Sequence, residues 1–339
     1  MKQRRLIQRL ARDKELVLVS AGDLALRRRR RGRGFQYLDA EGLPIRDKAT
    51  LARLQSLAVP PAYEKVRFAA DPRAHLQGVG EDDAGRIQYR YHPQWHAVRE
   101  AAKSDRLADL ARALPDIQRA VRRCLARRDD GLAYANAAVV YLVETTALRA
   151  GSENHARERG TRGATTLLKS NVEIKGHTLS LRFRAKGSKL IVRDVENRRL
   201  ATAVQRLLAL PGRRLFQHRK DGALRLVRAS DVNAFLREVS GRQISLKDFR
   251  AMVATLGVLE TLAATRPAIS ERSRRSQVRS AVATAAEELS NTPTVCRTSY
   301  VHDSVVAAFE QGALPRLVKR GSSPADRVAA LARIVARHG

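Results

Sequence analysis

The sequence predicts an α+β protein with two domains: a small strand-rich domain over residues 1–92, and a larger, mainly helical domain over residues 93–339 that carries a small β-sheet. Before residue 92, short runs of strand-forming residues alternate with Gly and Pro turns, whereas after it apolar residues recur at helical spacing. A length of 339 residues with 44% hydrophobic content is enough for two domains with cores of their own.

The N-terminal domain is expected to consist of strands and hairpins. Residues 24–37 contain the run RRRRRGRGFQY, in which glycines separate two extended segments, and VPPAYEKVRF supplies a Pro-Pro break before another strand. An acidic turn at 81–83 precedes a last strand at 88–91. An arginine run is usually a solvated cluster, but its flanking strand residues favour a basic sheet face that contacts phosphates.

The second domain is expected to be mainly helical. Residues 115–127 have apolar side chains at helical spacing, and residues 132–148 are apolar nearly all round, as in a buried helix. Further helices are predicted at 245–262, at 277–289, from residue 301 onwards with Tyr300 at the helix start, and near 324–337. The exception is a segment at 177–195. Its apolar and polar residues alternate from Leu179 to Ala185, and a turn at Gly187 leads into a return strand, which predicts a half-buried hairpin with Lys186 at its tip.

The net charge of +31 points to a polyanionic partner. Positive charge is spread over both domains, and binding a polyanion relieves the self-repulsion of such a chain. Nucleic acid is the leading candidate, because no basic amphipathic helix with an aromatic face favours a membrane surface. The longest apolar stretch, 137–143, is too short to cross a bilayer, and no signal-like run follows the N-terminal basic residues. We therefore expect a cytoplasmic protein.

Nucleotide and metal chemistry find little support in the sequence. The chain has no GxxxxGK[ST] phosphate loop, and the GRG sequence at 32–34 lacks the third glycine of a dinucleotide site. The dense carboxylate cluster at 81–83 is better explained as a solvated turn than as a two-metal site. Two cysteines, Cys124 and Cys296, make no zinc cluster. We therefore expect no metal and no cofactor.

Four residues are candidates for handling a phosphodiester without a metal: Arg149, Lys186, Arg250 and Tyr300. Such chemistry needs cations that neutralise charge on phosphate oxygens, a nucleophile and a proton donor. Taken alone, each candidate can be explained as an ordinary structural or surface residue. The cations can be surface charges or helix-end partners, and a tyrosine with a pKa of about 10 is a structural residue unless its site activates it. Composition cannot choose between these explanations.

The order and context of the candidates resemble a known family. LRAGS, RAKGSK on the hairpin, LKDFR and NTPTVCRTSY follow one another as in the catalytic domain of type IB DNA topoisomerases, in the compact form found in poxviruses and bacteria. GRGFQYLDAEG, VPPAYEKV and GRIQYRYHPQW are similar to segments of the same family's N-terminal domain. The resemblance covers most of the chain and implies the catalytic-domain fold that type IB topoisomerases share with tyrosine recombinases.

The resemblance implies a role for each candidate. Arg149 and Arg250 would grip the nonbridging oxygens of the scissile phosphate, and Lys186 would protonate the departing 5′ oxygen. Tyr300 would attack phosphorus and hold the DNA as a 3′-phosphotyrosyl ester until the free 5′ hydroxyl reseals the strand, without ATP or an obligatory metal. Lys247 matches the family's Lys-x-x-Arg arrangement and would assist proton movement or bind phosphate.

The resemblance also implies further contacts with duplex DNA. Asn291 stands where many relatives have histidine, and would donate a hydrogen bond to a nonbridging oxygen without titrating as an acid. DNA contacts are implied for Gln88, Tyr89, Arg90, Tyr91 and His155, the last in place of a tyrosine that is frequent in relatives. Taken singly, a half-buried strand explains the residues at 88–91 equally well.

Two other functions are compatible with parts of the sequence. A tyrosine recombinase shares the catalytic fold and nucleophile, but such enzymes usually have His-x-x-Arg where residues 247–250 are Lys-Asp-Phe-Arg, and their N-terminal domain is helical. A non-enzymatic basic DNA-binding protein would explain the charge but not the ordered catalytic segments. We therefore expect a monomeric enzyme, associated with the bacterial nucleoid, that surrounds double-stranded DNA and relaxes supercoils of either sign.

Overall fold

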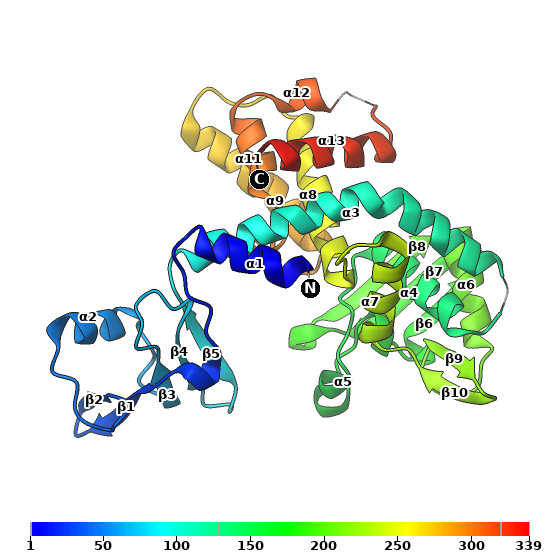
Figure 1. The fold of residues 1–339 in the computed structure, drawn as a ribbon. Coiled ribbons are helices and arrows are strands. Elements are labelled where there is room, and N and C mark those ends of the chain that lie inside the picture. Colours follow the sequence, from blue (N-terminus) through cyan, green and yellow to red (C-terminus); the bar gives the residue numbers. More distant parts are fainter. Residues whose placement is uncertain (1, 128, 319–320, 339) are drawn as a thin grey trace. The chain divides into compact units, whose positions relative to one another are not determined.

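The computed structural model describes residues 2–127, 129–318 and 321–338 (Figure 1). The chain forms two compact units, Met1–Lys103 and Ser104–Gly339. Their boundary lies within the long helix α3 (Trp95–Ala126), shortly after the change from strand to helix at residue 92. Within the described residues, no helix combines the length and the apolar character that crossing a bilayer requires.

The first unit is built on a five-stranded antiparallel sheet with the strand order β2-β1-β3-β4-β5 (Figure 1). The strands are β1 (Leu26–Arg31), β2 (Gly34–Leu38), β3 (Glu64–Phe68), β4 (Leu76–Glu81) and β5 (Ile87–Tyr91). The predicted first hairpin, the strand after the Pro-Pro break and the last strand are confirmed. Leu26, Val66 and Phe68 pack with Leu54 in a small core on one face of this sheet.

Two helices in this unit depart from the prediction of strands and turns alone. These are α1 (Lys2–Arg12) and α2 (Lys48–Ser56). The carboxylate of Asp47 accepts a hydrogen bond from the backbone N–H of Thr50 (2.8 Å), which caps the first turn of α2. The sequence therefore contained a helix-start signal that the surrounding turn residues obscured.

The arginine run lies on β1. One of its side chains is partly buried, and the other four are exposed to solvent. Arg28 stacks over the ring of Phe35, with Cζ 4.1 Å from the ring centroid, and donates hydrogen bonds to the carbonyls of Val59, Pro60 and Tyr63 (2.8–2.9 Å). It therefore holds a loop in place.

The second unit is mainly helical and carries two small antiparallel sheets. One has the order β6-β7-β8, with β6 (Val172–Lys175), β7 (Thr178–Arg184) and β8 (Leu190–Glu196); the other pairs β9 (Gln217–Lys220) with β10 (Ala223–Leu226). The longer helices are α4 (Leu132–Thr146), α6 (Arg198–Leu208), α7 (Ala229–Ser240), α8 (Leu246–Ala263), α9 (Glu271–Glu288) and α13 (Pro324–His338). The short ones are α5 (Glu153–Arg159), α10 (Pro293–Ser299), α11 (Asp303–Glu310) and α12 (Leu314–Leu317). The structure confirms the predicted hairpin within 177–195 and the predicted helices at 132–148, 245–262 and 324–337.

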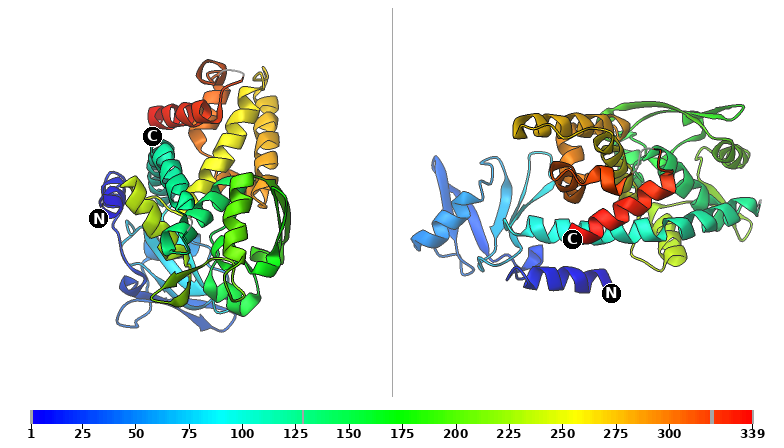
Figure 2. Two further views of the ribbon diagram at one scale, coloured as in Figure 1. Left: turned by 90° about the vertical axis from the view of Figure 1, so that its right-hand side faces the viewer. Right: turned by 90° about the horizontal axis from the view of Figure 1, so that it is seen from above.

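Helix α9 begins earlier than predicted. Its N-cap is Ser270, whose hydroxyl accepts a hydrogen bond from the backbone N–H of Ser273 (3.1 Å). The first two turns read ERSRRS and contain no apolar residue, so helical periodicity becomes visible only from Gln277 onwards. Helices α8 and α9 pack side by side as a hairpin (Figure 2).

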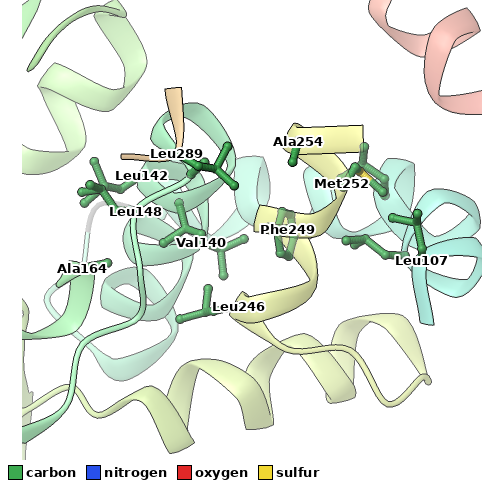
Figure 3. Close-up of a cluster of buried hydrophobic side chains, with 14 of the residues drawn as sticks. Leu107, Val140, Leu142, Leu148, Ala164, Leu246, Phe249, Met252, Ala254 and Leu289 are labelled. Atoms are coloured by element: carbon green, nitrogen blue, oxygen red, sulfur yellow. The ribbon is translucent and has the colours of Figure 1, made fainter. Parts of the chain in front are cut away.

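The core of the second unit fixes the ends of α4 and α8. Phe249 of α8 lies between Val140 of α4 and Leu107 of α3, and all three are at most 1% exposed (Figure 3). Burying a side chain of this size contributes about 1.5–3 kcal/mol. Because this packing surrounds the first turns of α8, the residues next to Phe249 have little freedom to move.

Candidate active site

Arg149 lies in the loop that follows α4. Ala147 ends the helix in the left-handed conformation (φ 51°), and the backbone N–H of Ala164 donates to the carbonyl of Arg149 (2.8 Å). Two stretches of backbone cross closely here, since a Cβ at Gly163 would lie 2.6 Å from the Arg149 carbonyl oxygen. Only glycine fits at that crossing, so the backbone that carries the Arg149 guanidinium is fixed.

Asn291 follows the C-terminus of α9. Its backbone N–H returns to the carbonyl of Ala286 (2.8 Å) after Ser290, which has a left-handed φ of 51°. The side-chain Oδ1 accepts a hydrogen bond from the Arg149 guanidinium, whereas the buried Nδ2 has no hydrogen-bond partner among the described residues. A buried amide without a partner is costly, and an oxygen of a bound phosphate would satisfy it.

Arg250 lies in the early turns of α8 and is only 4% exposed. Its terminal nitrogens donate to the carbonyls of Ala147 and Leu289, which close the C-terminal ends of α4 and α9. Helix C-termini leave carbonyls without intrahelical partners and carry a partial negative charge, so they suit a guanidinium. Nε of Arg250 is buried and has no hydrogen-bond partner in the described structure, which leaves N–H donors for a phosphate.

Tyr300 lies in the turn between two helices. It caps the C-terminus of α10, and α11 begins at Asp303 with His302 as its N-cap. This corrects the prediction that Tyr300 stands at the start of a helix that runs from residue 301. The hydroxyl of Thr255 on α8 donates to the Tyr300 carbonyl (3.0 Å), so the backbone of the tyrosine is tied to the helix that carries Arg250.

The phenol of Tyr300 lies among cations. Burial alone raises its pKa, but the charge and hydrogen bonding of Arg250, with the charges of Arg149 and Lys247, outweigh burial and leave the pKa below its ordinary value. The Cζ atom of Arg250 lies 5.1 Å from the centroid of the Tyr300 ring. A lowered pKa increases the fraction of phenolate at neutral pH, and phenolate is the nucleophilic form.

Lys186 lies at the tip of the hairpin of β7 and β8, as predicted. It starts a short turn, Lys186–Ser188, and its side chain is exposed. The preceding residue, Ala185, lines the same small pocket as Arg149 and Arg250. Lys186 is therefore at the edge of the cluster rather than within it. Lys247 is also exposed, one turn before Arg250 on α8.

The residues expected to contact DNA in the first unit lie on β5. The rings of Tyr89 and Tyr91 are stacked at 6.1 Å and are 44% and 40% exposed. The amide of Gln88 donates to Asp82 (2.8 Å), and Arg90 donates to a backbone carbonyl (3.3 Å). The strand therefore presents its two tyrosines to solvent, while Gln88 and Arg90 are engaged within the unit.

Three residues at this site were not singled out by the sequence. Besides Thr255, these are Ser104 and His302, whose Oγ and Nε2 atoms are 2.5 Å apart in a buried contact; His302 follows Tyr300 by two residues in the chain. Nδ1 of His302 accepts from the backbone N–H of Ser304 (3.2 Å), so the Nε2–H donates to Ser104. The sequence signal for these residues was limited to polar residues that stand among apolar ones.

His155, by contrast, is exposed on α5 and joins no part of the cluster around Tyr300.

The structure thus brings Arg149, Arg250, Asn291 and Tyr300 together and leaves the other candidates at the margin or elsewhere. The positive charges of two guanidinium groups act on a phenol of lowered pKa, and an amide is bonded to one of these groups. This arrangement is suited to stabilising charge on a phosphate while an oxygen nucleophile attacks it. The described residues include no group of three or more His, Cys, Asp and Glu side chains placed to hold a metal ion.

The chain matches known protein families over most of its length. Residues 92–314 match the family described as eukaryotic DNA topoisomerase I, catalytic core, and residues 34–82 match bacterial DNA topoisomerase IB, N-terminal domain. DNA topoisomerase 1B of Acanthamoeba polyphaga mimivirus is 26% identical over 289 residues, which are 81% of this chain and 84% of the viral protein. The first match spans more than half of the chain and includes the whole cluster around Tyr300. The chain therefore belongs to the type IB DNA topoisomerase family, whose members are isomerases that act on DNA.

Proposed function

We propose that this protein relaxes positive and negative supercoils in duplex DNA by cutting one strand through Tyr300, allowing the free end to rotate, and resealing the strand. The observation that carries the proposal is that Arg250 and Arg149, the latter bonded to Asn291, act on a tyrosine of lowered pKa. A passive DNA-binding protein would have no need for a buried arginine beside an activated phenol.

Cleavage in this proposal is a transesterification. The Tyr300 oxygen forms a bond to phosphorus as the bond to the 5′ oxygen breaks, and the DNA 3′ end becomes a phosphotyrosyl ester. Arg149, Arg250 and the free Nδ2 of Asn291 stabilise charge on the nonbridging oxygens. The phenol releases its proton to water, Lys186 gives one proton to the 5′ oxygen, and Lys186 is reprotonated from water, so that no proton is gained or lost overall. Lys247 assists by its charge.

Resealing is the reverse of cleavage. The 5′ hydroxyl attacks the phosphotyrosyl ester and releases Tyr300. Because the ester retains the energy of the original phosphodiester, the cycle needs neither ATP nor an obligatory metal, and torsional strain in the DNA drives its direction. We propose that the protein acts as a monomer on chromosomal DNA. Residues 1–92 serve as a DNA-binding domain, and Tyr89, Tyr91 and His155 contact the duplex.

The test of this function is plasmid relaxation by the wild type in EDTA without ATP. We expect positively and negatively supercoiled plasmids to be relaxed, and we expect the rate to fall steeply with salt, because binding depends on phosphate neutralisation. Absence of relaxation would contradict the proposal. A requirement for two specific DNA sites, with exchange of strands between them, would instead indicate a recombinase.

The role of Lys186 is tested by changing the leaving group. Lys186→Ala is expected to slow cleavage about 10²- to 10⁴-fold, because it removes the proton donor. A substrate with sulfur in place of the bridging 5′ oxygen releases a thiolate that needs no proton, so it should restore at least part of the rate. Lys189→Ala, which removes an exposed lysine from the same hairpin, should show neither the defect nor the rescue. A Lys186→Ala defect of equal size on both substrates would exclude a proton-donor role.

A further inference from the structure

Arg193 lies on β8 at a position that faces the interior of the second unit. It pairs across the sheet with the buried Leu181, and it alternates along the strand with Val192, which is 61% exposed. Burial lowers the pKa of Arg193. An arginine at an inward position of a half-buried strand requires compensating polar partners.

Its partners are the ends of two helices. The two terminal nitrogens of Arg193 donate to the carbonyls of Thr146, the last residue of α4, and Glu288, the last residue of α9. Arg250 makes the same kind of bridge one residue further along at each helix end, by donating to the carbonyls of Ala147 and Leu289. Two guanidinium groups therefore join the same pair of helix C-termini in parallel.

These helix ends carry two of the proposed phosphate ligands. Arg149 follows α4, Asn291 follows α9, and the Arg149 guanidinium donates directly to the Asn291 amide oxygen. The distance between the two ends therefore sets the distance between the two ligands. Arg193 is also on the strand that follows the Lys186 turn, so it connects this hairpin to the ends of α4 and α9.

The electrostatics explain why arginine is used at this position. Positive charges this close together repel one another, but the negative ends of two helix dipoles offset the repulsion. A planar guanidinium can place separate N–H groups on two carbonyls at once, whereas a lysine ammonium at the end of a flexible chain offers no such fork.

We infer that Arg193 is a positioning residue for strand cleavage. It holds the C-terminal end of α4, which precedes Arg149, at a fixed distance from the C-terminal end of α9, which precedes Asn291. It also attaches the Lys186 hairpin to both helix ends. This inference rests on the proposed function and deepens it. Both terminal nitrogens of Arg193 face backbone carbonyls, so Arg193 acts through Arg149 and Asn291 and not by contact with the phosphate.

The experiment compares Arg193→Gln with a control variant, Arg274→Gln. Arg274 is another arginine of this unit that donates to two backbone carbonyls. Arg274 donates to the carbonyls of Ala268 (3.0 Å) and Ile269 (2.7 Å), in the loop before the N-terminus of α9, at the far end of the helix from Asn291. We expect Arg193→Gln to slow single-turnover cleavage at saturating DNA about 10- to 100-fold, the usual cost of a misplaced ligand. Arg274→Gln should lower the unfolding temperature but change the cleavage rate less than about twofold.

Two readouts separate positioning from other roles. A direct phosphate contact would lower the slope of log K against log salt by about 0.9 on substitution, whereas a positioning residue leaves the slope unchanged. Because Arg193 acts in part through Asn291, the double variant Arg193→Gln/Asn291→Ala should lose less activity than the product of the two single losses. Arg193→Lys should recover only part of the rate, and it replaces Arg193→Gln in each comparison if the glutamine variant does not fold.

The possible outcomes distinguish the inference about Arg193 from the proposed function. A wild type that cleaves DNA, with an Arg193 variant as active as Arg274→Gln, overturns the inference and leaves the proposed function standing. A lowered salt slope or multiplicative losses in the double variant also overturn it. A wild type that forms no covalent adduct overturns the proposed function itself, and the inference with it.

Discussion

Replacement of Tyr300 by phenylalanine is expected to abolish strand cleavage and relaxation. The change removes only the phenolic oxygen, which is the proposed nucleophile, and no other tyrosine lies among the ligands described at the site. The bonds that hold residue 300 in place involve its backbone, with the N–H on the Cys296 carbonyl (3.0 Å) and the carbonyl on Thr255 (3.0 Å). Folding and noncovalent DNA binding should therefore be unchanged.

The measurement is the amount of DNA trapped covalently when denaturant is added to an equilibrium mixture. Thermal unfolding and the affinity for an uncleaved duplex serve as controls for structure and binding. Covalent trapping at the wild-type level by Tyr300→Phe would show that another residue attacks the DNA.

Arg250→Ala is expected to slow cleavage about 10³-fold or more, the range found when an arginine that stabilises a phosphoryl-transfer transition state is removed. Two losses combine in this variant. The phosphate loses a buried cation, and the phenol of Tyr300 loses a charge that lowers its pKa. Arg250→Lys should recover little, since an ammonium cannot bridge Ala147 and Leu289 and also meet a phosphate.

The variant should also be less stable. Each helix-end carbonyl that loses a charged donor and remains buried costs about 1–3 kcal/mol. Single-turnover rates must therefore be measured well below the unfolding temperature of each variant. Arg250→Ala would contradict the proposed role if it stayed folded and cleaved DNA within about tenfold of the wild type, because that is far less than the expected loss of charge stabilisation.

The fold was predictable where local signals and tertiary structure agree. The helix from Ser245 and the hairpin around Gly187 have caps, periodicity and turn residues that all point the same way. Strand β4, LQGVGE, was not predicted, because its glycines disfavour a strand. The structure needs them: a Cβ at Gly78 would lie 2.9 Å from the ring of Phe68, and one at Gly80 would lie 3.0 Å from Val66. Close packing against β3 is a tertiary requirement that no local pattern reveals.

The site was predictable as a set of residues and not as an arrangement. The motifs around Arg149, Arg250, Asn291 and Tyr300 identified which side chains to examine. The sequence could not show that α4 and α9 end side by side, so that Arg250 has two carbonyl partners and Arg193 a matching pair. These bonds join residues far apart in the chain, and only the packing of α4, α8 and α9 creates them.

The most direct test of the account is identification of the covalent bond itself. A duplex labelled separately at each end of the cleaved strand is trapped with denaturant, digested with protease, and the DNA-linked peptide is identified by mass spectrometry. The account predicts that the 3′ phosphate is joined to the peptide that contains Tyr300, with a free 5′ hydroxyl on the other fragment. A bond to the 5′ end of the DNA, or to any other residue, would contradict it.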